Sequence, residues 1–569
     1  MRLIARHLRT VGATVAAVAA LAACSDDNGN GPDAPFAPQN VVATAASPTS
    51  IVVTWSAVSG ADGYQVERAP QGGTFAEVGS RLSTTTYTDD AVTAETQYQY
   101  RVRAFRGNTP SNYSNVVSIT TQSAGPKAAT LAGEIAQSRT LYRDTLYTLS
   151  GFVKVKSGAT LTIQPGTKIV GDAAVPGSSL WILRGARIDA QGTATEPIVF
   201  TSAKPAGSRK PGDWGGIVIV GNARINRTAN PIFTEGPAAE AVNYAGGADD
   251  DDDSGILRYV RIEFAGYDVS NGQGQELNGL SMYAVGRGTT IEYVQTFGGL
   301  DDSFEWFGGA VDARYLVSYE SGDDHFDFAE GFRGRVQNMI ALQTQVIQPA
   351  PSAGTLSSDP RGFEGDGCES NKAGCTYANQ PYTAPVFANF TVVGPGAGVF
   401  AANDGNGAVV RRGAAATFVN GIIARWPGVG ISIRDAESDQ LRQKDSLTVR
   451  NVILAENGSN FEAAGTNFGA ALNTPANQIQ SLTGAGSAAA LFASLTPASL
   501  DWTPAAGSAA RTGSLADFAG TAIAGRVSDL FNQPGTSITA TNYIGAADPD
   551  GVKWWQGWTA YYACTANGC

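Results

Sequence analysis

The chain has 569 residues, which is enough for two or three domains and a large core. Only 16% of the residues are charged, glycine occurs 68 times and methionine 3 times, which is the composition of a β-rich secreted protein. The net charge of −12 argues against nucleic acid and anionic membrane surfaces as partners, and it is compatible with cation binding.

The N-terminus has the features of an export signal. Three arginines precede an apolar run over residues 11–23 that is too short to span a bilayer. The run ends in L-A-A-C, which resembles the bacterial lipobox, whose cysteine is lipidated and becomes the mature N-terminus. We therefore expect a signal peptide over residues 1–23 and a lipid anchor on Cys24; the alternative is an ordinary signal peptide with a chance cysteine. The S-D-D that follows resembles the export signal of surface lipoproteins and predicts an outer-membrane protein that faces the cell surface.

Residues 24–35 are predicted to be a flexible tether, and a domain of short strands follows. The tether is polar and has nothing to bury. Over residues 36–122, alternating strands are separated by turns, among them I-V-V-T-W ending at Trp55 and Y-Q-Y-R-V-R-A beginning at Tyr98. This pattern resembles a fibronectin type III domain, and the resemblance implies a core role for Trp55 and makes Tyr98 the corner tyrosine. We interpret the domain as a stalk.

Residues 131–463 are predicted to form a solenoid. Short strand signals recur 19 residues apart, with glycine and proline at the bends between them. The phrases L-T-I-Q-P-G-T (161–167), P-I-V-F-T-S (197–202) and W-W-Q-G-W-T (554–559) resemble a large group of bacterial extracellular right-handed parallel β-helix proteins. Many proteins of that group are lipoproteins, and most lack an assigned activity. The resemblance implies an all-β chain, with a fibronectin type III sandwich followed by a right-handed parallel β-helix.

One unit occurs twice in this region, offset by 22 residues. The sequence I-E-Y-V-Q-T-F-G-G-L-D-D-S-F-E-W-F-G-G from residue 291 aligns with A-R-Y-L-V-S-Y-E-S-G-D-D-H-F-D-F-A-E-G from residue 313. Such a period suits one coil, and stacked coils lie about 4.8 Å apart. The shared acids should therefore form an acidic ladder on one face of the solenoid, and they are Asp301, Asp302, Glu305, Asp323, Asp324 and Asp327.

The acidic ladder predicts a metal site. Stacked carboxylates repel one another unless they are protonated or neutralised by a cation. Ca²⁺ fits best, because it accepts many oxygen ligands in a flexible shell. The alternative is that these carboxylates cap backbone N–H groups at the bends or pair with Arg314, Arg333 and Arg335. The five aspartates at 249–253 are a weaker candidate for Ca²⁺ binding, since charge runs are usually solvated.

Other residues of this region are candidates for contact with a ligand. Trp306 alternates with the acids and is predicted to be a platform for a sugar ring, and Arg333 is a candidate ligand-binding cation. Pectate lyases and polygalacturonases also have the β-helix fold. A lyase needs Ca²⁺-binding acids and a base, for which Arg333 or His325 is the candidate here, whereas a hydrolase needs a pair of carboxylates. The chain lacks the G-H-G and R-I-K tracts of polygalacturonases, we assign His325 to the surface, and we interpret the protein as noncatalytic.

Asparagines recur further along the solenoid. Asn389, Asn420 and Asn451 are spaced 31 residues apart, and Asn338 has the same local context. A side-chain amide donates and accepts hydrogen bonds, so each asparagine can bond to its copy in the next coil. We assign this series to structure rather than to catalysis.

The cysteines that follow Cys24 form two close pairs. Cys368 and Cys375 lie in a long loop over residues 343–384, and Cys564 and Cys569 close the chain. In an oxidising compartment each pair predicts a small disulfide loop. Zinc is the alternative, although His325 is the only histidine after the signal peptide. The loop itself is long enough to suggest a function.

Residues 464–569 are predicted to be an Ala- and Gly-rich segment and the C-terminal cap of the β-helix. We expect this material to pack over the end or side of the solenoid, because an open coil end exposes unpaired strand edges. Taken together, the sequence predicts a noncatalytic surface protein that adheres to, or binds, an extracellular polysaccharide or other surface polymer with Ca²⁺ on its acidic face. The alternatives are a Ca²⁺-dependent polysaccharide lyase or glycoside hydrolase, and an architectural subunit that assembles with itself.

Overall fold

The computed structural model describes residues 34–122, 127–270, 274–400, 405–463, 465, 467–515 and 539–569. The predicted signal peptide, Cys24 and most of the predicted tether lie outside these residues. The chain divides into two compact units, Met1–Gly125 and Pro126–Cys569. Among the described residues, no helix has both the length and the apolar character needed to cross a membrane.

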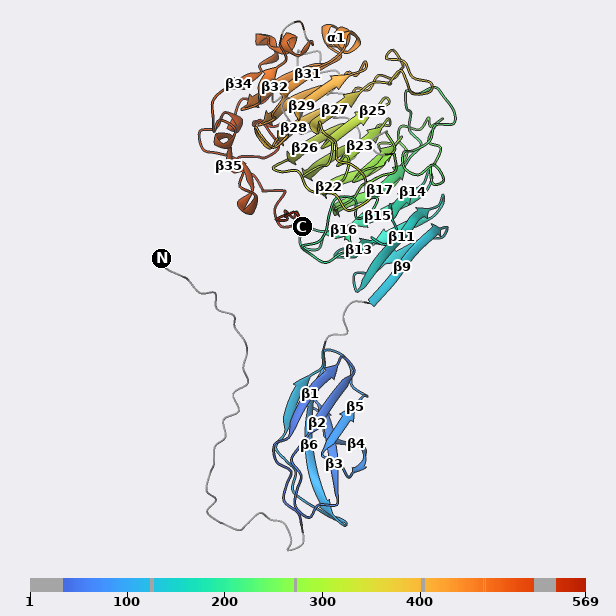
Figure 1. Cartoon of the computed structure of the whole chain (residues 1–569), viewed down its shortest axis with the longest axis vertical. Helices are drawn as coiled ribbons and strands as arrows, with labels where there is room; N and C mark the ends of the chain where they lie inside the picture. Colours follow the sequence, from blue (N-terminus) through green and yellow to red (C-terminus); the bar gives the residue numbers. More distant parts are fainter. Residues whose placement is uncertain are drawn as a thin grey trace. The chain divides into compact units, whose positions relative to one another are not determined.

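The first unit is a sandwich of two antiparallel sheets (Figure 1). The first sheet has the order β1-β2-β5, and the second has the order β4-β3-β6-β7 with β8 also paired to β6. The strands are β1 (Val42–Ser47), β2 (Ser50–Thr54), β3 (Gly63–Pro70), β4 (Ala76–Leu82), β5 (Thr86–Asp89), β6 (Gln97–Arg106), β7 (Thr109–Pro110) and β8 (Val117–Thr120). Trp55 packs on Tyr64 in the core, and the Tyr98 hydroxyl accepts the backbone N–H of Thr93 at 3.1 Å, as a corner tyrosine should.

The second unit is a parallel β-helix whose first coils are built from strands of 3 to 11 residues (Figure 1). These strands are β9 (Lys127–Ile135), β10 (Arg139–Leu141), β11 (Thr145–Val155), β12 (Thr160–Ile163), β13 (Lys168–Gly171), β15 (Arg187–Gln191) and β16 (Ile198–Ser202). Later coils each add one short strand and one long, bent strand.

The short strands stack in one column, in which each strand pairs with the next. This column contains β14 (Ser179–Ile182), β17 (Ile217–Val220), β21 (Leu280–Tyr283), β23 (Phe304–Phe307), β25 (Phe326–Ala329), β27 (Arg361–Asp366), β29 (Asn406–Arg411), β31 (Val429–Ile433) and β33 (Ser459–Phe461). The long strands form the facing column, which contains β18 (Gly255–Glu263), β22 (Thr290–Phe297), β24 (Ala313–Tyr319), β26 (Arg335–Leu342), β28 (Val386–Val393), β30 (Thr417–Ala424) and β32 (Thr448–Ala455).

Each long strand bends at one residue whose φ is positive, between 51° and 61°. These residues lie in register, and they are Tyr259, Tyr293, Tyr315, Asn338, Asn389, Asn420 and Asn451. Asparagine tolerates this left-handed conformation better than most residues. The Asn451 amide donates to the Asn420 side-chain oxygen at 2.8 Å, as the predicted asparagine ladder requires, whereas the Asn338 and Asn389 amides donate to backbone carbonyls of the C-terminal segment. Sequence reasoning missed that three stacked tyrosines continue it, with ring centroids 4.3 and 4.4 Å apart.

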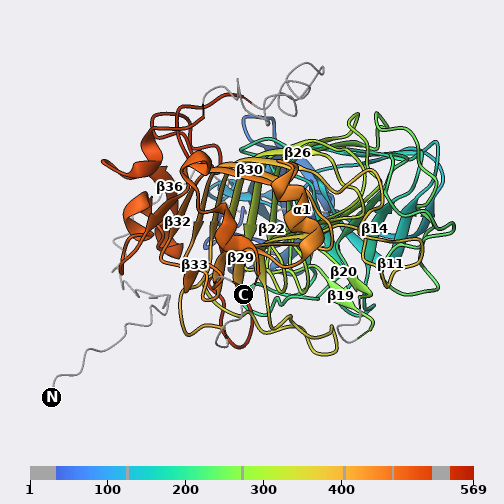
Figure 2. The ribbon, with the colours of Figure 1, turned by 90° about the horizontal axis from the view of Figure 1, so that it is seen from above.

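The smaller elements surround this solenoid. They are the hairpin β19 (Tyr267–Asp268) and β20 (Glu276–Leu277), helix α1 (Ala436–Gln443), β34 (Gln480–Leu482), and the pair β35 (Phe492–Ser494) and β36 (Asp501–Pro504). Five short 3₁₀ turns, the first at Gly469–Leu472 and the last at Ala509–Arg511, lie among them. Figure 2 shows α1 lying over the last coils, where it contacts β29. Strand β34 pairs with β32, so the stack of coils continues beyond residue 463.

The C-terminal segment lies along the side of the solenoid rather than across its end. Its contacts run from late coils back to early ones, and Figure 1 shows the C-terminus beside β16. The contacts are Asn389 with Tyr543, Asn338 with Ala546, Tyr293 with Trp558, Glu263 with Tyr562 and Arg209 with Cys569. The expected cap is therefore a strap, because its aromatic rings pack against the tyrosine bends.

Candidate functional site

Three carboxylates form successive rungs on the outside of the short-strand column. Glu305 on β23 is the register partner of Asp327 on β25, which in turn is the partner of Glu364 on β27. The inward neighbours on these strands are Phe304, Phe326 and Phe363, whose rings follow one another 5.6 and 5.3 Å apart. Because side chains alternate along a strand, a buried phenylalanine at one position places the next carboxylate outside.

Glu364 is a member of the acidic ladder that the sequence prediction missed. The 22-residue period ends before it, because the loop between β26 and β27 lengthens that coil. The signal was nevertheless present in the sequence, since the pairs F-E at 304, F-D at 326 and F-E at 363 repeat the same inward–outward order.

A second row of carboxylates lies at the bend before these strands. The N–H of Asp302 donates to the Asn278 side-chain oxygen at 3.1 Å, and the N–H of Asp324 donates to Asp302 at 2.8 Å. The N–H of Arg361 then donates to Asp324 at 2.6 Å. The capping alternative therefore holds for one oxygen of each aspartate, and the other oxygen of Asp302 remains without a hydrogen bond among the described residues.

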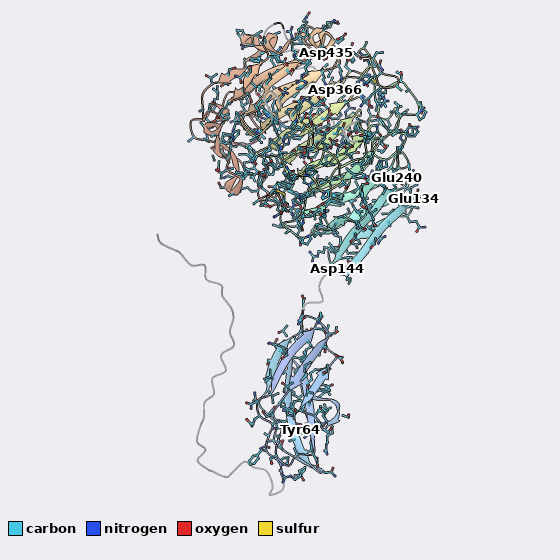
Figure 3. The ribbon with its side chains drawn as sticks, viewed as in Figure 1. Tyr64, Glu134, Asp144, Glu240, Asp366 and Asp435 are labelled. Carbon is cyan, nitrogen blue, oxygen red and sulfur yellow. A yellow bond between two sulfur atoms is a disulfide. The ribbon has the colours of Figure 1, made fainter. Side chains whose placement is uncertain are left out.

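The two rows line an open hollow of about 440 Å³, which we call the acidic cleft. The loop over 343–384 forms part of its wall, and the predicted disulfide between Cys368 and Cys375 closes that loop. Asp366, at the end of β27, marks this part of the molecule in Figure 3. The charged lining residues are Glu235, Glu276, Asp301, Asp302, Glu305, Asp323, Asp327, Glu364, Asp366, Glu369, Lys372, Arg411 and Arg412. The second predicted disulfide, Cys564–Cys569, also forms, in the strap.

The cations of this region are engaged with only some of the acids. Arg361 pairs with Asp324 and Glu364, whereas Arg411 and Arg412 pair with Asp366. Seven other lining carboxylates have no ion pair within the described part of the chain; five belong to the acidic ladder (Asp301, Asp302, Glu305, Asp323 and Asp327), and the other two are Glu235 and Glu276. The acidic cleft therefore brings together carboxyl groups that no cation in the described part of the chain pairs with.

Burial makes these charges costly. It raises the pKa of Asp301, Asp302, Glu305 and Asp327 well above the usual range, and the neighbouring carboxylates raise it further. Burial also raises the pKa of Asp323 to about 7, although Arg361 opposes the rise. The buried carboxyl groups thus compete for protons near neutral pH, and a cation would serve the same purpose as a proton.

The oxygen atoms are close enough to share a cation. Three groups each offer oxygens within 4.8 Å of one another, and these groups are Asp301/Asp302/Asp323, Asp302/Glu305/Asp327 and Asp324/Asp327/Glu364. One oxygen of Asp323 and one of Asp327 are buried and have no hydrogen-bond partner in the described structure. Asp302 and Glu305 are only 6% and 7% exposed. An all-oxygen donor set with unsatisfied buried oxygens fits a hard cation such as Ca²⁺.

The prediction of Trp306 as a sugar platform is wrong. Its side chain is 0% exposed and stacks in the core against Phe304 and Phe332, with ring centroids 6.2 and 5.2 Å away. The physical reason is strand alternation: Glu305 faces the acidic cleft, so both of its neighbours on β23 must point inward.

Arg333 and His325 also lie elsewhere than predicted. The Arg333 guanidinium binds both carboxylate oxygens of Asp250 at 3.1 Å, which partly neutralises the aspartate run and keeps Arg333 out of the acidic cleft. His325 is buried rather than on the surface, with Nδ1 2.5 Å from the Ser318 hydroxyl. Burial lowers the pKa of His325 to about 3, so neither residue is placed to act as a base on a ligand in the cleft.

The predicted arginine partners do not neutralise the acidic ladder. Arg314 pairs with Glu292, and Arg335 pairs with Asp312. Together with Arg333, these arginines fall on the long-strand side of the coil or in the loops, so they balance other acids.

Comparison with known proteins agrees with this architecture. Residues 133–503 match the family model of the pectate-lyase-like β-helix domain, and residues 36–120 match the fibronectin type III domain. The chain belongs to the pectate-lyase-like β-helix family and carries an N-terminal fibronectin type III domain. No curated protein matches the chain.

Solved structures that contain fibronectin type III domains are similar to a part of this chain. An Fn3-like protein from Clostridium thermocellum is 28% identical over 15% of this chain and 93% of its own, with a TM-score of 0.15. A titin fragment is 27% identical over 16% of this chain, with a TM-score of 0.15. The chain spans only 33% of that fragment.

Proposed function

We propose that the protein is a lipid-anchored surface protein that binds an extracellular polysaccharide through Ca²⁺ held in the acidic cleft. The observation that carries this proposal is the set of five ladder carboxylates that line the cleft without an ion pair in the described structure. The β-helix fold supports it, because a rigid column of repeated side chains suits an extended polymer.

In this proposal each part of the chain has one task. Lipidated Cys24 fixes the protein to the outer membrane, and the fibronectin domain holds the β-helix away from it. Asp301, Asp302, Glu305, Asp323 and Asp327 hold Ca²⁺, whose remaining coordination positions accept oxygens of the glycan. Binding is noncatalytic, nucleic acid is not a partner, and assembly with further copies remains a separate hypothesis that particle-size measurements would test.

Calorimetric titration of the mature chain with Ca²⁺ tests the proposal. Cys24→Ser keeps the protein soluble for this measurement. We expect saturable heat, and we expect the double variant Asp301→Asn/Asp323→Asn to lose most of it. Asp90→Asn, an exposed acid of the fibronectin domain, is the matched control. Heat that is absent, or unchanged in the double variant, would show that the carboxylates are only caps of the bends.

A hydrolase is the second candidate, and a specific observation favours it over a lyase. The acidic cleft contains carboxyl groups whose pKa burial raises, such as Glu305 and Glu364, and a raised pKa is what a general acid requires. Burial opposes the charge on Lys372 and Arg411, but nearby acids favour the charged forms and raise the pKa of both side chains. A protonated side chain cannot accept the proton that a lyase removes from its substrate. Release of reducing sugar without an unsaturated product would identify the hydrolase.

A further inference from the structure

A hollow of about 770 Å³, larger than the acidic cleft, lies on the long-strand side of the β-helix. The bend tyrosines Tyr259, Tyr293 and Tyr315 line it from the solenoid, and the strap lines it with residues 539–543 and with side chains between 548 and 556. We call this hollow the strap pocket. None of its lining residues lines the acidic cleft, so the two hollows are separate sites.

The strap holds this pocket in place because the loop over 547–553 is tied at both ends. The indole N–H of Trp554 donates to the carbonyl of Ala546 at 2.9 Å, and the Asn338 amide of the solenoid donates to the same carbonyl at 3.0 Å. Lys553 is fixed by an ion pair with Asp501 at 2.6 Å. The strap pocket is therefore formed before any ligand arrives, as small-molecule sites usually are.

Aromatic rings of two kinds line the strap pocket. The three bend tyrosines cover one another's faces, so they meet a ligand with their edges and hydroxyl groups. Trp554 is partly exposed, and its neighbours Tyr315 and Trp555 are inclined to it by 53° and 87°, so neither ring lies flat on the indole. Burial raises the pKa of Tyr293, which keeps that hydroxyl protonated and able to donate. The pocket thus combines an indole face with a row of neutral hydroxyl groups.

The charged side chains of the strap pocket favour a neutral ligand over an anion. Arg314 is held by Glu292 at 2.6 Å, and Lys553 is held by Asp501. Asp548 has no ion pair in the described part of the chain, and its Oδ1 accepts a backbone N–H of its own loop at 2.9 Å. A carboxylate accepts strong hydrogen bonds from hydroxyl groups, so Asp548 suits a ligand that carries hydroxyls and no negative charge.

We propose that the strap pocket binds a neutral sugar chain, with one sugar ring stacked on Trp554 and its hydroxyl groups bonded to Asp548 and to the bend tyrosines. The weakly positive C–H groups of a sugar ring pack well on the negative face of an indole. A lipid chain would fill the same space but would leave the hydroxyl groups of the pocket unsatisfied. Because the strap pocket shares no residue with the acidic cleft, this binding needs no Ca²⁺ and does not rest on the proposed function.

Calorimetric titrations of the mature Cys24→Ser chain test this inference. The probes are the neutral oligosaccharides cellohexaose, xylohexaose and mannohexaose, each in a buffer with EDTA. The variants are Trp554→Ala and Asp548→Asn, of which the second keeps the Oδ1 acceptor and thus the loop. The matched controls are Tyr142→Ala, an exposed ring of the first coils, and Asp550→Asn, an acid of the same loop that does not line the strap pocket.

We expect at least one probe to bind the parent chain without Ca²⁺, and each variant to weaken that binding about tenfold. The controls and the ladder variant Asp301→Asn/Asp323→Asn should bind like the parent chain. Full binding by Asp548→Asn and by a folded Trp554→Ala chain would overturn the inference, as would failure of all three probes. Loss of binding in the ladder variant would place the sugar in the acidic cleft and also overturn it. Ca²⁺ heat is measured separately, so each of these outcomes leaves the proposed function to its own test.

Discussion

Two ladders of identical or similar side chains run along the same solenoid, and they differ in how their stacked polar groups are satisfied. Along the bends of the long strands, the Asn451 amide donates to Asn420, and the Asn338 and Asn389 amides donate to the strap. On the outside of the short strands, Glu305, Asp327 and Glu364 can only accept, and their stacking concentrates negative charge. Repetition of a side chain is therefore structural where the group both donates and accepts, and it requires a cation or proton where the group only accepts.

The largest expected effect comes from breaking the amide ladder at Asn420. This residue has φ 53°, is 2% exposed, accepts the N–H of Leu515 and accepts the Asn451 amide. Asn420→Val places a β-branched residue in the left-handed region and leaves both donors unpaired, so we expect a loss of about 3 kcal/mol or more of unfolding free energy. Chemical denaturation measures it. Asn420→Gly keeps the conformation and should lose clearly less; equal losses would contradict a backbone contribution.

The next effect concerns pH and Ca²⁺ at the acidic ladder. In the folded chain, the pKa of Asp323 and that of Asp324 are each raised to about 7. At a pH between the usual aspartate pKa and this raised value, the folded chain therefore binds more protons than the unfolded chain. Stability without Ca²⁺ must therefore fall as pH rises from about 4 to about 7. We expect Ca²⁺ at a hundredfold excess over its Kd to raise the free energy of unfolding by about 3 kcal/mol, with the largest increase near pH 7. Differential scanning calorimetry across pH checks this. A Tm that rises with pH in the metal-free protein would contradict it.

A smaller effect should follow from making the acidic ladder resemble the amide ladder. Burial raises the pKa of the Asp327 carboxyl group, so the ionised form is unfavourable there. Asp327→Asn removes the ionisable group and keeps the shape of the side chain. We expect the metal-free variant to gain about 1 kcal/mol in unfolding free energy and to bind Ca²⁺ more weakly. The reciprocal variant Asn389→Asp, which loses donors to Tyr543 and Gly545, should be destabilised. If both variants shift stability in the same direction, the contrast between the ladders is wrong.

The smallest effect is expected at Trp306 and Arg333. Both lie outside the acidic cleft, one in the core and one paired with Asp250. Trp306→Phe and Arg333→Gln should change the affinity for Ca²⁺ and for any glycan by no more than about twofold. Titration of both variants under identical conditions provides the comparison. A tenfold or larger loss of glycan affinity in either variant would show that the substituted residue contacts the ligand.

The architecture could be predicted from the amino-acid sequence alone, because repetition is a local signal. The two 22-residue units place Tyr293 over Tyr315 and Asp302 over Asp324 as soon as coils stack, and the structure confirms that register. The fibronectin domain could be predicted in the same way. Trp55 and Tyr98 occupy apolar positions of alternating strands, and both side chains are buried in the core of this domain.

By contrast, the set of side chains that face the acidic cleft, and the cations that pair with them, became known from the folded structure. Glu364 joins the ladder from beyond the repeat, Trp306 turns inward beside Glu305, and Lys372 reaches the cleft from the loop over 343–384. Residues on different loops meet through long-range folding that leaves no periodic trace in the sequence. Ion pairing likewise depends on distances across coils, so the sequence supplies the acids, and the fold decides which of them remain without a partner among the described residues.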